Sequence, residues 1–129
     1  MINSNLDDAR YFSLATFRKS GVAVETPVWF AEGTEPGAYY VFSAGDAGKV
    51  KRLRVGDQAR VAACDARGKL LGDWCPARAR LLEAPADIAA ALAALHRKYG
   101  WLMWTTDLLA RLSGRFDKRA YIRVKVIEA

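Results

Sequence analysis

Residues 43–54 read SAGDAGKVKRLR, and this stretch joins the end of a strand to a basic helix through a loop of small residues. Asp46 is the predicted N-cap of the helix, and Gly56 suits the position just after its end. The helix N-terminus presents free backbone N–H groups, and the lysine at its start adds a cation. This arrangement is typical of a loop that holds one anion, and an ordinary solvated helix with a basic face fits the same spacing.

The charged residues of this helix differ in where they point. Lys49 and Arg52 stand three positions apart and therefore share one side of the helix, whereas Lys51 projects elsewhere. If the stretch binds an anion, Ser43 at the strand end, Lys49 and Arg52 are the candidates for contact.

The segments around this stretch predict a mainly β (α+β) protein with one domain over residues 1–129. Segments with the alternation or composition of strands are 10–17, 22–30, 38–43, 59–64, 70–83 and 119–128. Two further helices are expected, one from Pro85 to a stop at Gly100 and one over 106–113. Short turns favour antiparallel pairing, and six strands with one apolar face favour a closed or nearly closed barrel with the helices outside.

Two aromatic segments could line a pocket for a flat ring. In Thr26-Pro27-Val28-Trp29, Pro27 interrupts the strand ladder and leaves neighbouring backbone groups free to bond a ring edge. An edge strand whose Trp29 packs under a helix fits equally well. Trp74, in the segment Asp73-Trp74-Cys75-Pro76, could stack on a ligand or a partner subunit, or be half-buried core.

Composition limits the function classes. Twenty Lys and Arg against fourteen Asp and Glu give a net charge of +6, which suits phosphate-bearing small molecules or nucleic acid. Cys64 and Cys75 are not at metal-ligand spacing and are expected to be free thiols, and His96 is the only histidine, so no metal site is expected. No apolar run is long enough to span a membrane and residues 1–8 do not resemble a signal peptide, so a cytoplasmic protein is expected.

The succession of these motifs resembles the pyridoxamine 5'-phosphate oxidase-like split-barrel family. The resemblance runs from about Ala9 to Ile127, and it is carried by the order of residues 26–30, 39–43, 48–54 and 59–61. Among the branches of this family, the chain is most similar to the short proteins described as probable F420-dependent enzymes. It lacks the C-terminal Arg-x-His signature of the true oxidases, because His96 is the only histidine, so pyridoxamine phosphate is not the expected substrate.

The resemblance implies homodimers with two cofactor sites in the groove between the subunits. The implied cofactor-binding positions are Thr26, Pro27, Val28, Trp29, Phe42, Ser43, Gly48, Lys49, Arg52 and Trp74. Ser43, Lys49 and Arg52 would hold phosphate, the second strand and Phe42 would lie against the ring, and Trp74 would close the pocket of the opposite subunit.

The implied cofactor is FMN or the deazaflavin F420, since each has a tricyclic ring, a ribityl chain and phosphate. The expected activity is hydride transfer between this cofactor and a small-molecule acceptor, with no catalytic side chain assigned. Two alternatives remain at this point. One is a basic barrel that stacks single-stranded nucleic acid on Trp29, Tyr39, Tyr40 and Trp74. The other is a haem-binding relative of the same fold, for which one histidine and two methionines leave few axial ligands.

Overall fold

The computed structural model of the chain describes residues 9–127, so the expectations for residues 1–8 and for Glu128 lie outside it. Its strands are β1 (Tyr11–Phe17), β2 (Ala23–Glu32), β3 (Ala38–Ala44), β4 (Gln58–Cys64), β5 (Cys75–Leu81) and β6 (Arg119–Val126). They close into a barrel in the order β1-β2-β3-β6-β5-β4, and every pairing is antiparallel. The predicted six-stranded antiparallel barrel is therefore confirmed.

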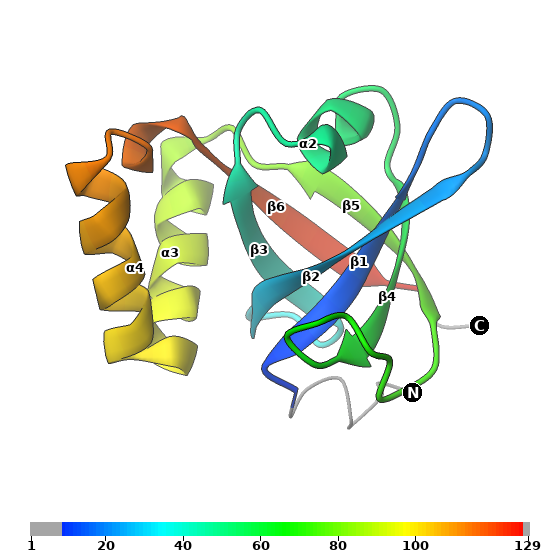
Figure 1. The fold of residues 1–129 in the computed structure, drawn as a ribbon, viewed down its shortest axis with the longest axis horizontal. Coiled ribbons are helices and arrows are strands. Elements are labelled where there is room, and N and C mark those ends of the chain that lie inside the picture. Colours follow the sequence, from blue (N-terminus) through cyan, green and yellow to red (C-terminus); the bar gives the residue numbers. More distant parts are fainter. Residues whose placement is uncertain (1–8, 128–129) are drawn as a thin grey trace.

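The helices lie outside the barrel (Figure 1). The short helix α2 (Gly48–Leu53) follows β3, while α3 (Pro85–Tyr99) and α4 (Trp101–Leu112) connect β5 to β6 through the 3-10 turn η1 (Phe116–Lys118). In Figure 1, α3 lies between the barrel and α4, so α4 is the outermost element. No helix within residues 9–127 is long and apolar enough to cross a membrane.

Several predicted element bounds differ from the structure, and three of the differences have a local structural cause. The N-cap of α2 is Ala47 rather than Asp46, because the loop closes through a hydrogen bond from the Ala47 N–H to the Ala44 carbonyl oxygen. The fifth strand begins at Cys75, not at residue 70, since Leu70 makes only an isolated bridge to Cys64 before Gly72 and Asp73 break the ladder.

The second long helix also begins earlier than predicted. Gly100 adopts φ +57°, a left-handed conformation that glycine tolerates, and it ends α3 and caps α4 at the same time. One residue is thus enough to turn the chain, and α4 begins at Trp101 rather than at Thr106.

The apolar residues form two cores. One fills the barrel and centres on Phe12, Phe30 and Tyr39, whose rings contact one another. The other lies between the barrel wall and the helices, with Leu95 and Met103 fully buried in it.

The barrel is split between β2 and β3. β2 pairs with β1 from Ala23 to Trp29, but it pairs with β3 only over Phe30–Glu32. β3 pairs with β6 along its whole length, so β2 and β3 diverge at Phe30. This divergence leaves one edge of β2 without a strand partner beside the start of α2.

Candidate functional site

The divergence of β2 from β3 opens a cavity of about 340 Å³. Its lining residues are Tyr11, Pro27, Val28, Trp29, Phe42, Lys49 and Thr106. Five of these are predicted cofactor-binding residues, and they come from three separate elements, β2, β3 and α2. Thr26 is half-buried in the adjacent ladder opposite Leu14 and does not line this cavity.

Lys49 forms the polar end of this cavity, and Ser43, which lines a neighbouring cavity, lies beside it. The Lys49 ammonium donates a hydrogen bond to the Ser43 hydroxyl at 3.3 Å. No carboxylate of residues 9–127 forms an ion pair with Lys49. Burial and, to a smaller extent, the nearby positive charge of Arg52 lower the pKa of Lys49 below its usual value. An uncompensated, half-buried cation beside a hydroxyl is a favourable place for a phosphate group.

Arg52 adds a second positive charge close to Lys49. Its Nε donates to the Thr16 hydroxyl at 2.6 Å, which fixes the guanidinium against the end of β1. The guanidinium also lies against Gly48, where a Cβ atom would come within 2.9 Å of an Arg52 terminal nitrogen. Gly48 therefore has a steric role in admitting Arg52, and Arg52 itself faces a neighbouring cavity rather than the one that Lys49 lines.

The side chain of Trp29 packs mainly against other aromatic side chains of the protein. Its indole stacks on Tyr99 with a centroid separation of 4.5 Å and meets the Phe42 ring edge-on at 6.2 Å. The Tyr99 hydroxyl is bound by both backbone groups of Phe30, and burial raises its pKa. Because Tyr99 of α3 already occupies one face of the indole, a ligand ring would have to contact this wall through the strand backbone, Val28 and Phe42.

A second cavity, of about 920 Å³, shares Phe42 with the Lys49 cavity and is also lined by Ser43. Its cationic lining residues are Arg54, Arg115, Lys118 and Arg119. Arg115, Lys118 and Arg119 lie close together in the sequence, but no sequence pattern joined them to Ser43. A Cβ atom at Gly45 would collide with the Lys118 carbonyl oxygen, so Gly45 lets η1 approach the β3–α2 loop.

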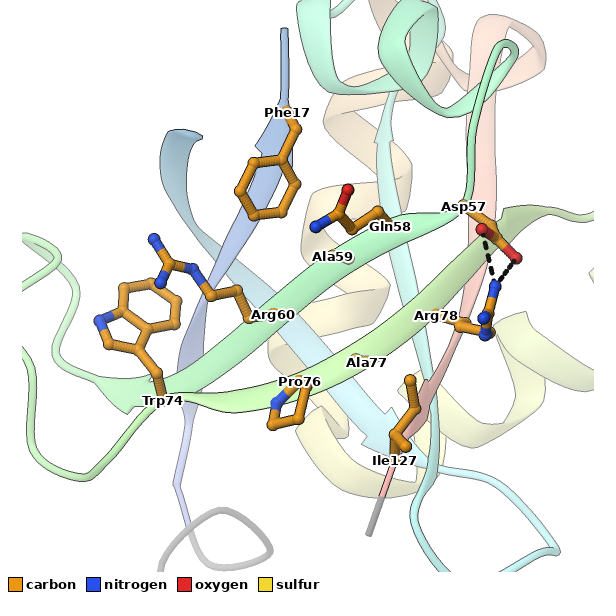
Figure 2. Close-up of a pocket in the computed structure, with 10 residues that line it drawn as sticks. All are labelled: Phe17, Asp57, Gln58, Ala59, Arg60, Trp74, Pro76, Ala77, Arg78 and Ile127. Carbon is orange, nitrogen blue, oxygen red and sulfur yellow. Dashed lines mark hydrogen bonds and ion pairs between the residues drawn. The ribbon is translucent and has the colours of Figure 1, made fainter. Parts of the chain in front are cut away.

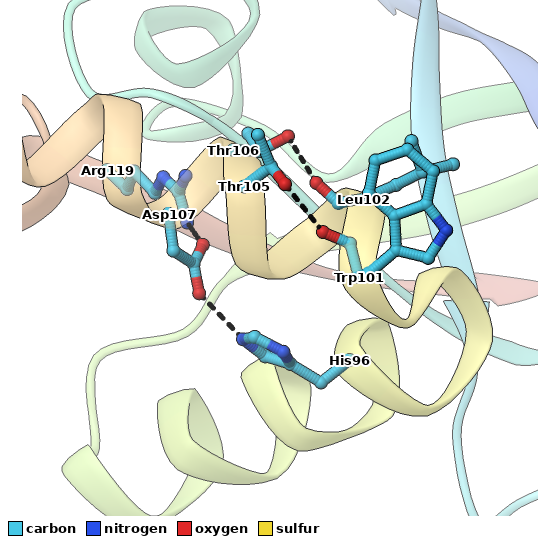
Figure 3. A network of polar contacts seen from close by, with 7 residues as sticks. All are labelled: His96, Trp101, Leu102, Thr105, Thr106, Asp107 and Arg119. Atoms are coloured by element: carbon cyan, nitrogen blue, oxygen red, sulfur yellow. Dashed lines mark hydrogen bonds and ion pairs between the residues drawn. The ribbon is translucent and has the colours of Figure 1, made fainter.

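A buried ion pair fixes Arg119, which is one of the residues lining this second cavity (Figure 3). Arg119 donates to Asp107 at 2.6 Å, and the other oxygen of Asp107 lies 2.6 Å from His96 Nε2. The Arg119 guanidinium also lies 4.6 Å from the centre of the Phe42 ring. The network thus ties α3 and α4 to the residue that separates the two cavities.

Trp74 lies in a different part of the molecule from the other predicted site residues. It lines a cavity of about 790 Å³ over β4 and β5, which shares no residue with the Lys49 cavity (Figure 2). In the ring order of the barrel, β4 and β5 lie opposite β2 and β3. A contact between Trp74 and a cofactor at Lys49 would therefore have to come from another copy of the chain.

The residues at the split fit a phosphorylated flavin-type cofactor. Ser43 and Lys49 offer a hydroxyl and a charge without a carboxylate partner, while Pro27, Val28 and Phe42 offer a mainly apolar wall. Pro27 has no N–H to donate, and β2 has no strand partner on its outer edge there. The backbone of Val28 and Trp29 can consequently bond the edge of a ring.

No family model and no curated protein matches the sequence. Among solved structures, the haem storage protein HutZ of Vibrio cholerae matches with a TM-score of 0.71 and 14% identity, covering 97% of this chain and 87% of HutZ. A candidate 5-nitroimidazole antibiotic resistance protein of Bacteroides thetaiotaomicron matches with a TM-score of 0.70 and 15% identity, over 98% of this chain and 78% of that protein.

A candidate pyridoxamine 5'-phosphate oxidase of Listeria innocua has a TM-score of 0.61 and 10% identity, over 97% of this chain and 90% of that protein. At these identities the likeness concerns the fold. The chain has the six-stranded split-barrel fold of pyridoxamine 5'-phosphate oxidase-like proteins.

Proposed function

We propose that this protein is an oxidoreductase that binds FMN or F420 at the split between β2 and β3. The observation that carries the proposal is the Lys49–Ser43 pair, because a half-buried ammonium with no carboxylate partner among residues 9–127 lies at the polar end of an otherwise mainly apolar cavity. When bound, such a cofactor supplies or accepts a hydride through its ring.

The protein's own contribution is binding and orientation. Lys49 and Ser43 hold the phosphate, and Arg52 raises the local positive charge while Thr16 fixes its position. Val28 and Phe42 form the wall against which the ring lies, and Trp29 supports that wall from its stack on Tyr99. These residues orient the ring and exclude water from one face, so that a small-molecule acceptor approaches the other face.

The direct test is to release any bound ligand from the purified protein and to identify it by absorbance and mass spectrometry. The ligand-free protein is then titrated with FMN and with F420, following cofactor fluorescence. Binding of either cofactor with one site per chain supports the proposal. If neither binds at micromolar concentration, the proposal is wrong.

The proposal includes a homodimer with the cofactor sites at the subunit interface. It is supported by the open form of the Lys49 cavity, whose lining residues cover one side of a ring and leave the other side to a second copy. Light scattering that reports a monomer while cofactor still binds tightly would argue against this arrangement.

The nucleic-acid alternative is less favoured by the geometry. Tyr39 is only 1% exposed inside the barrel, and Trp29 is stacked on Tyr99, so neither offers a free face to a base. Trp74 lies across the barrel from both.

The haem alternative has HutZ as its support, since that neighbour is a haem storage protein. In this chain, however, the Nε2 of His96 is bound to Asp107, and His96 lines neither cavity beside Ser43. A haem titration followed at the Soret band, with His96→Ala as the comparison, separates this function from flavin binding.

A further inference from the structure

Helix α4 carries an exposed apolar face that the proposed function does not use. Five of its large apolar side chains are between 42% and 77% exposed, and they are Trp101, Trp104, Leu108, Leu109 and Leu112. Together they leave on the order of 500 to 700 Å² of apolar surface in solvent, which is more than monomeric proteins usually expose in one place. α4 is also the outermost element, with α3 between it and the barrel (Figure 1).

The inward side of α4 is already covered. Met103 is fully buried in the same core as Leu95 of α3. Asp107, the only acid of α4, is buried and ion-paired with Arg119. Thr106 faces the barrel and lines the Lys49 cavity. A helix with apolar residues on all sides is normally buried on all sides, so the outward face of α4 has the composition of a contact surface.

The outward residues have the spacing of a helix–helix contact. Trp101, Thr105, Leu108 and Leu112 follow one another at steps of four, three and four positions, so they form one line along the helix. This order of steps is the same when it is read from either end. An antiparallel copy related by a two-fold axis would therefore place Trp101 beside Leu112 of the partner subunit, and Thr105 beside Leu108 of the partner subunit.

The one polar side chain on this line can be buried without loss. The Thr105 hydroxyl donates a hydrogen bond to the Trp101 carbonyl oxygen at 2.9 Å, so covering it leaves no donor unsatisfied. Thr105 is also the smallest residue of the line, and it lies near the middle, where two crossing helices approach most closely.

The charges of α4 favour a second copy over a lipid surface. A helix that lies on a membrane carries several cations beside its apolar face. Arg111 is the only basic residue of α4, and its guanidinium carbon lies 3.8 Å from the centre of the Phe116 ring. The outward face therefore offers apolar contact and almost no charge, which is what a second copy of the same face also offers.

We propose that α4 is a self-association surface, on which α4 of a second copy packs in antiparallel orientation about a two-fold axis. The contact would bury on the order of 1,000 to 1,400 Å² over both copies, which is at the lower end of specific interfaces, so association in the micromolar range is expected. The proposal does not rest on the cofactor, because Thr106 reaches the Lys49 cavity from the other side of α4. If the homodimer at the split also forms, the α4 contact joins such dimers into larger assemblies.

Sedimentation equilibrium of the full chain, without added cofactor and over a range of concentrations, tests this contact. Wild-type protein at tens of micromolar should have at least twice the mass of Trp101→Gln/Leu112→Gln, whose association should be at least about tenfold weaker. Both side chains are more than 70% exposed, so the variant should fold, and circular dichroism checks this. Val22→Gln is the matched control, since Val22 is an exposed apolar residue outside α4, and it should have the mass of wild type. The mass that the double variant retains, one chain or two, reports separately on the homodimer at the split.

A pair of charge variants identifies the occupant as a second copy. Thr105→Glu and Thr105→Lys should each lose the heavier species, because like charges meet near the two-fold axis, and an equimolar mixture of the two should restore it. Equal masses of wild type and Trp101→Gln/Leu112→Gln, or a mixture that stays dissociated, would overturn the proposal. So would binding of wild type to phosphatidylglycerol vesicles that the double variant loses without any change of mass, because the face would then belong to a lipid surface.

Discussion

The ammonium of Lys49 lies 3.3 Å from the hydroxyl of Ser43, and this contact joins the first turn of α2 to the end of β3 beside the split in the barrel. The contact is polar but not an ion pair, so the charge of Lys49 remains available to a ligand. Lys51, two residues further on, is exposed on the same helix and makes no such contact.

This difference predicts unequal effects of two alanine substitutions. Lys49→Ala should weaken FMN or F420 binding by about 1.5 to 3 kcal/mol, the usual loss for a charge-assisted hydrogen bond, whereas Lys51→Ala should change it little. Fluorescence titration of both variants measures the difference. Equal losses would mean that α2 is merely a basic surface.

Lys49 should also limit the stability of the ligand-free protein. Its pKa is lowered by burial in the folded chain, so the unfolded chain binds more protons between that lowered pKa and the ordinary value of 10.5. Stability should therefore rise with pH through this window as the folded protein loses the buried charge. Below the window, Lys49→Met should be at least as stable as wild type while binding the cofactor more weakly.

Urea denaturation of wild type and Lys49→Met across this pH range checks the prediction. The free energy of unfolding of the wild type should rise toward that of Lys49→Met as the pH rises. Lys51→Met serves as the control. A wild-type protein that loses stability relative to Lys49→Met as pH rises would contradict the assigned cause.

The features of this protein that could be predicted are those encoded in short stretches of sequence. Alternation located β2, β3 and β6, and the hydroxyl–glycine–lysine succession brought Ser43 and Lys49 to one place, as the structure has them. The role of Asp46 was predicted wrongly because the loop closes through backbone groups, a feature that side-chain identity does not report.

Other relationships depend on long-range packing and had no sequence signal. Tyr99 meets Trp29 and Phe30 across about seventy positions of chain, and Asp107 meets Arg119 and His96 only because α3 and α4 pack together. Arg60 belongs to no sequence motif. Its Nε without a hydrogen-bond partner and its position over Phe17 and Trp74 are known only from the structure.

Tyr99 should be a strong anchor between α3 and the barrel. Its hydroxyl accepts from the Phe30 N–H at 2.9 Å and lies 2.6 Å from the Arg10 carbonyl oxygen. Tyr99→Phe leaves the buried Phe30 N–H without a partner and should cost about 1 to 3 kcal/mol. Urea denaturation measures it, with Tyr40→Phe as a half-buried control. A loss as small as that of the control would show that packing alone holds α3.

The basic cavity beside Ser43 should distinguish the two cofactors. Arg115 and Lys118 are exposed cations at its wall, and they have no carboxylate partner within residues 9–127. FMN ends at its phosphate, whereas F420 continues into a polyglutamate tail that would reach this wall from Ser43. The double variant Arg115→Gln/Lys118→Gln should therefore weaken F420 binding several-fold, by about 1 kcal/mol, and leave FMN binding nearly unchanged.

The loss of F420 affinity in the double variant should shrink as the salt concentration is raised, because exposed charges are screened. Arg97→Gln, an exposed cation on α3, should affect neither cofactor. Equal effects on FMN and F420 in the double variant would mean that this cavity attracts anions in general and does not hold the tail.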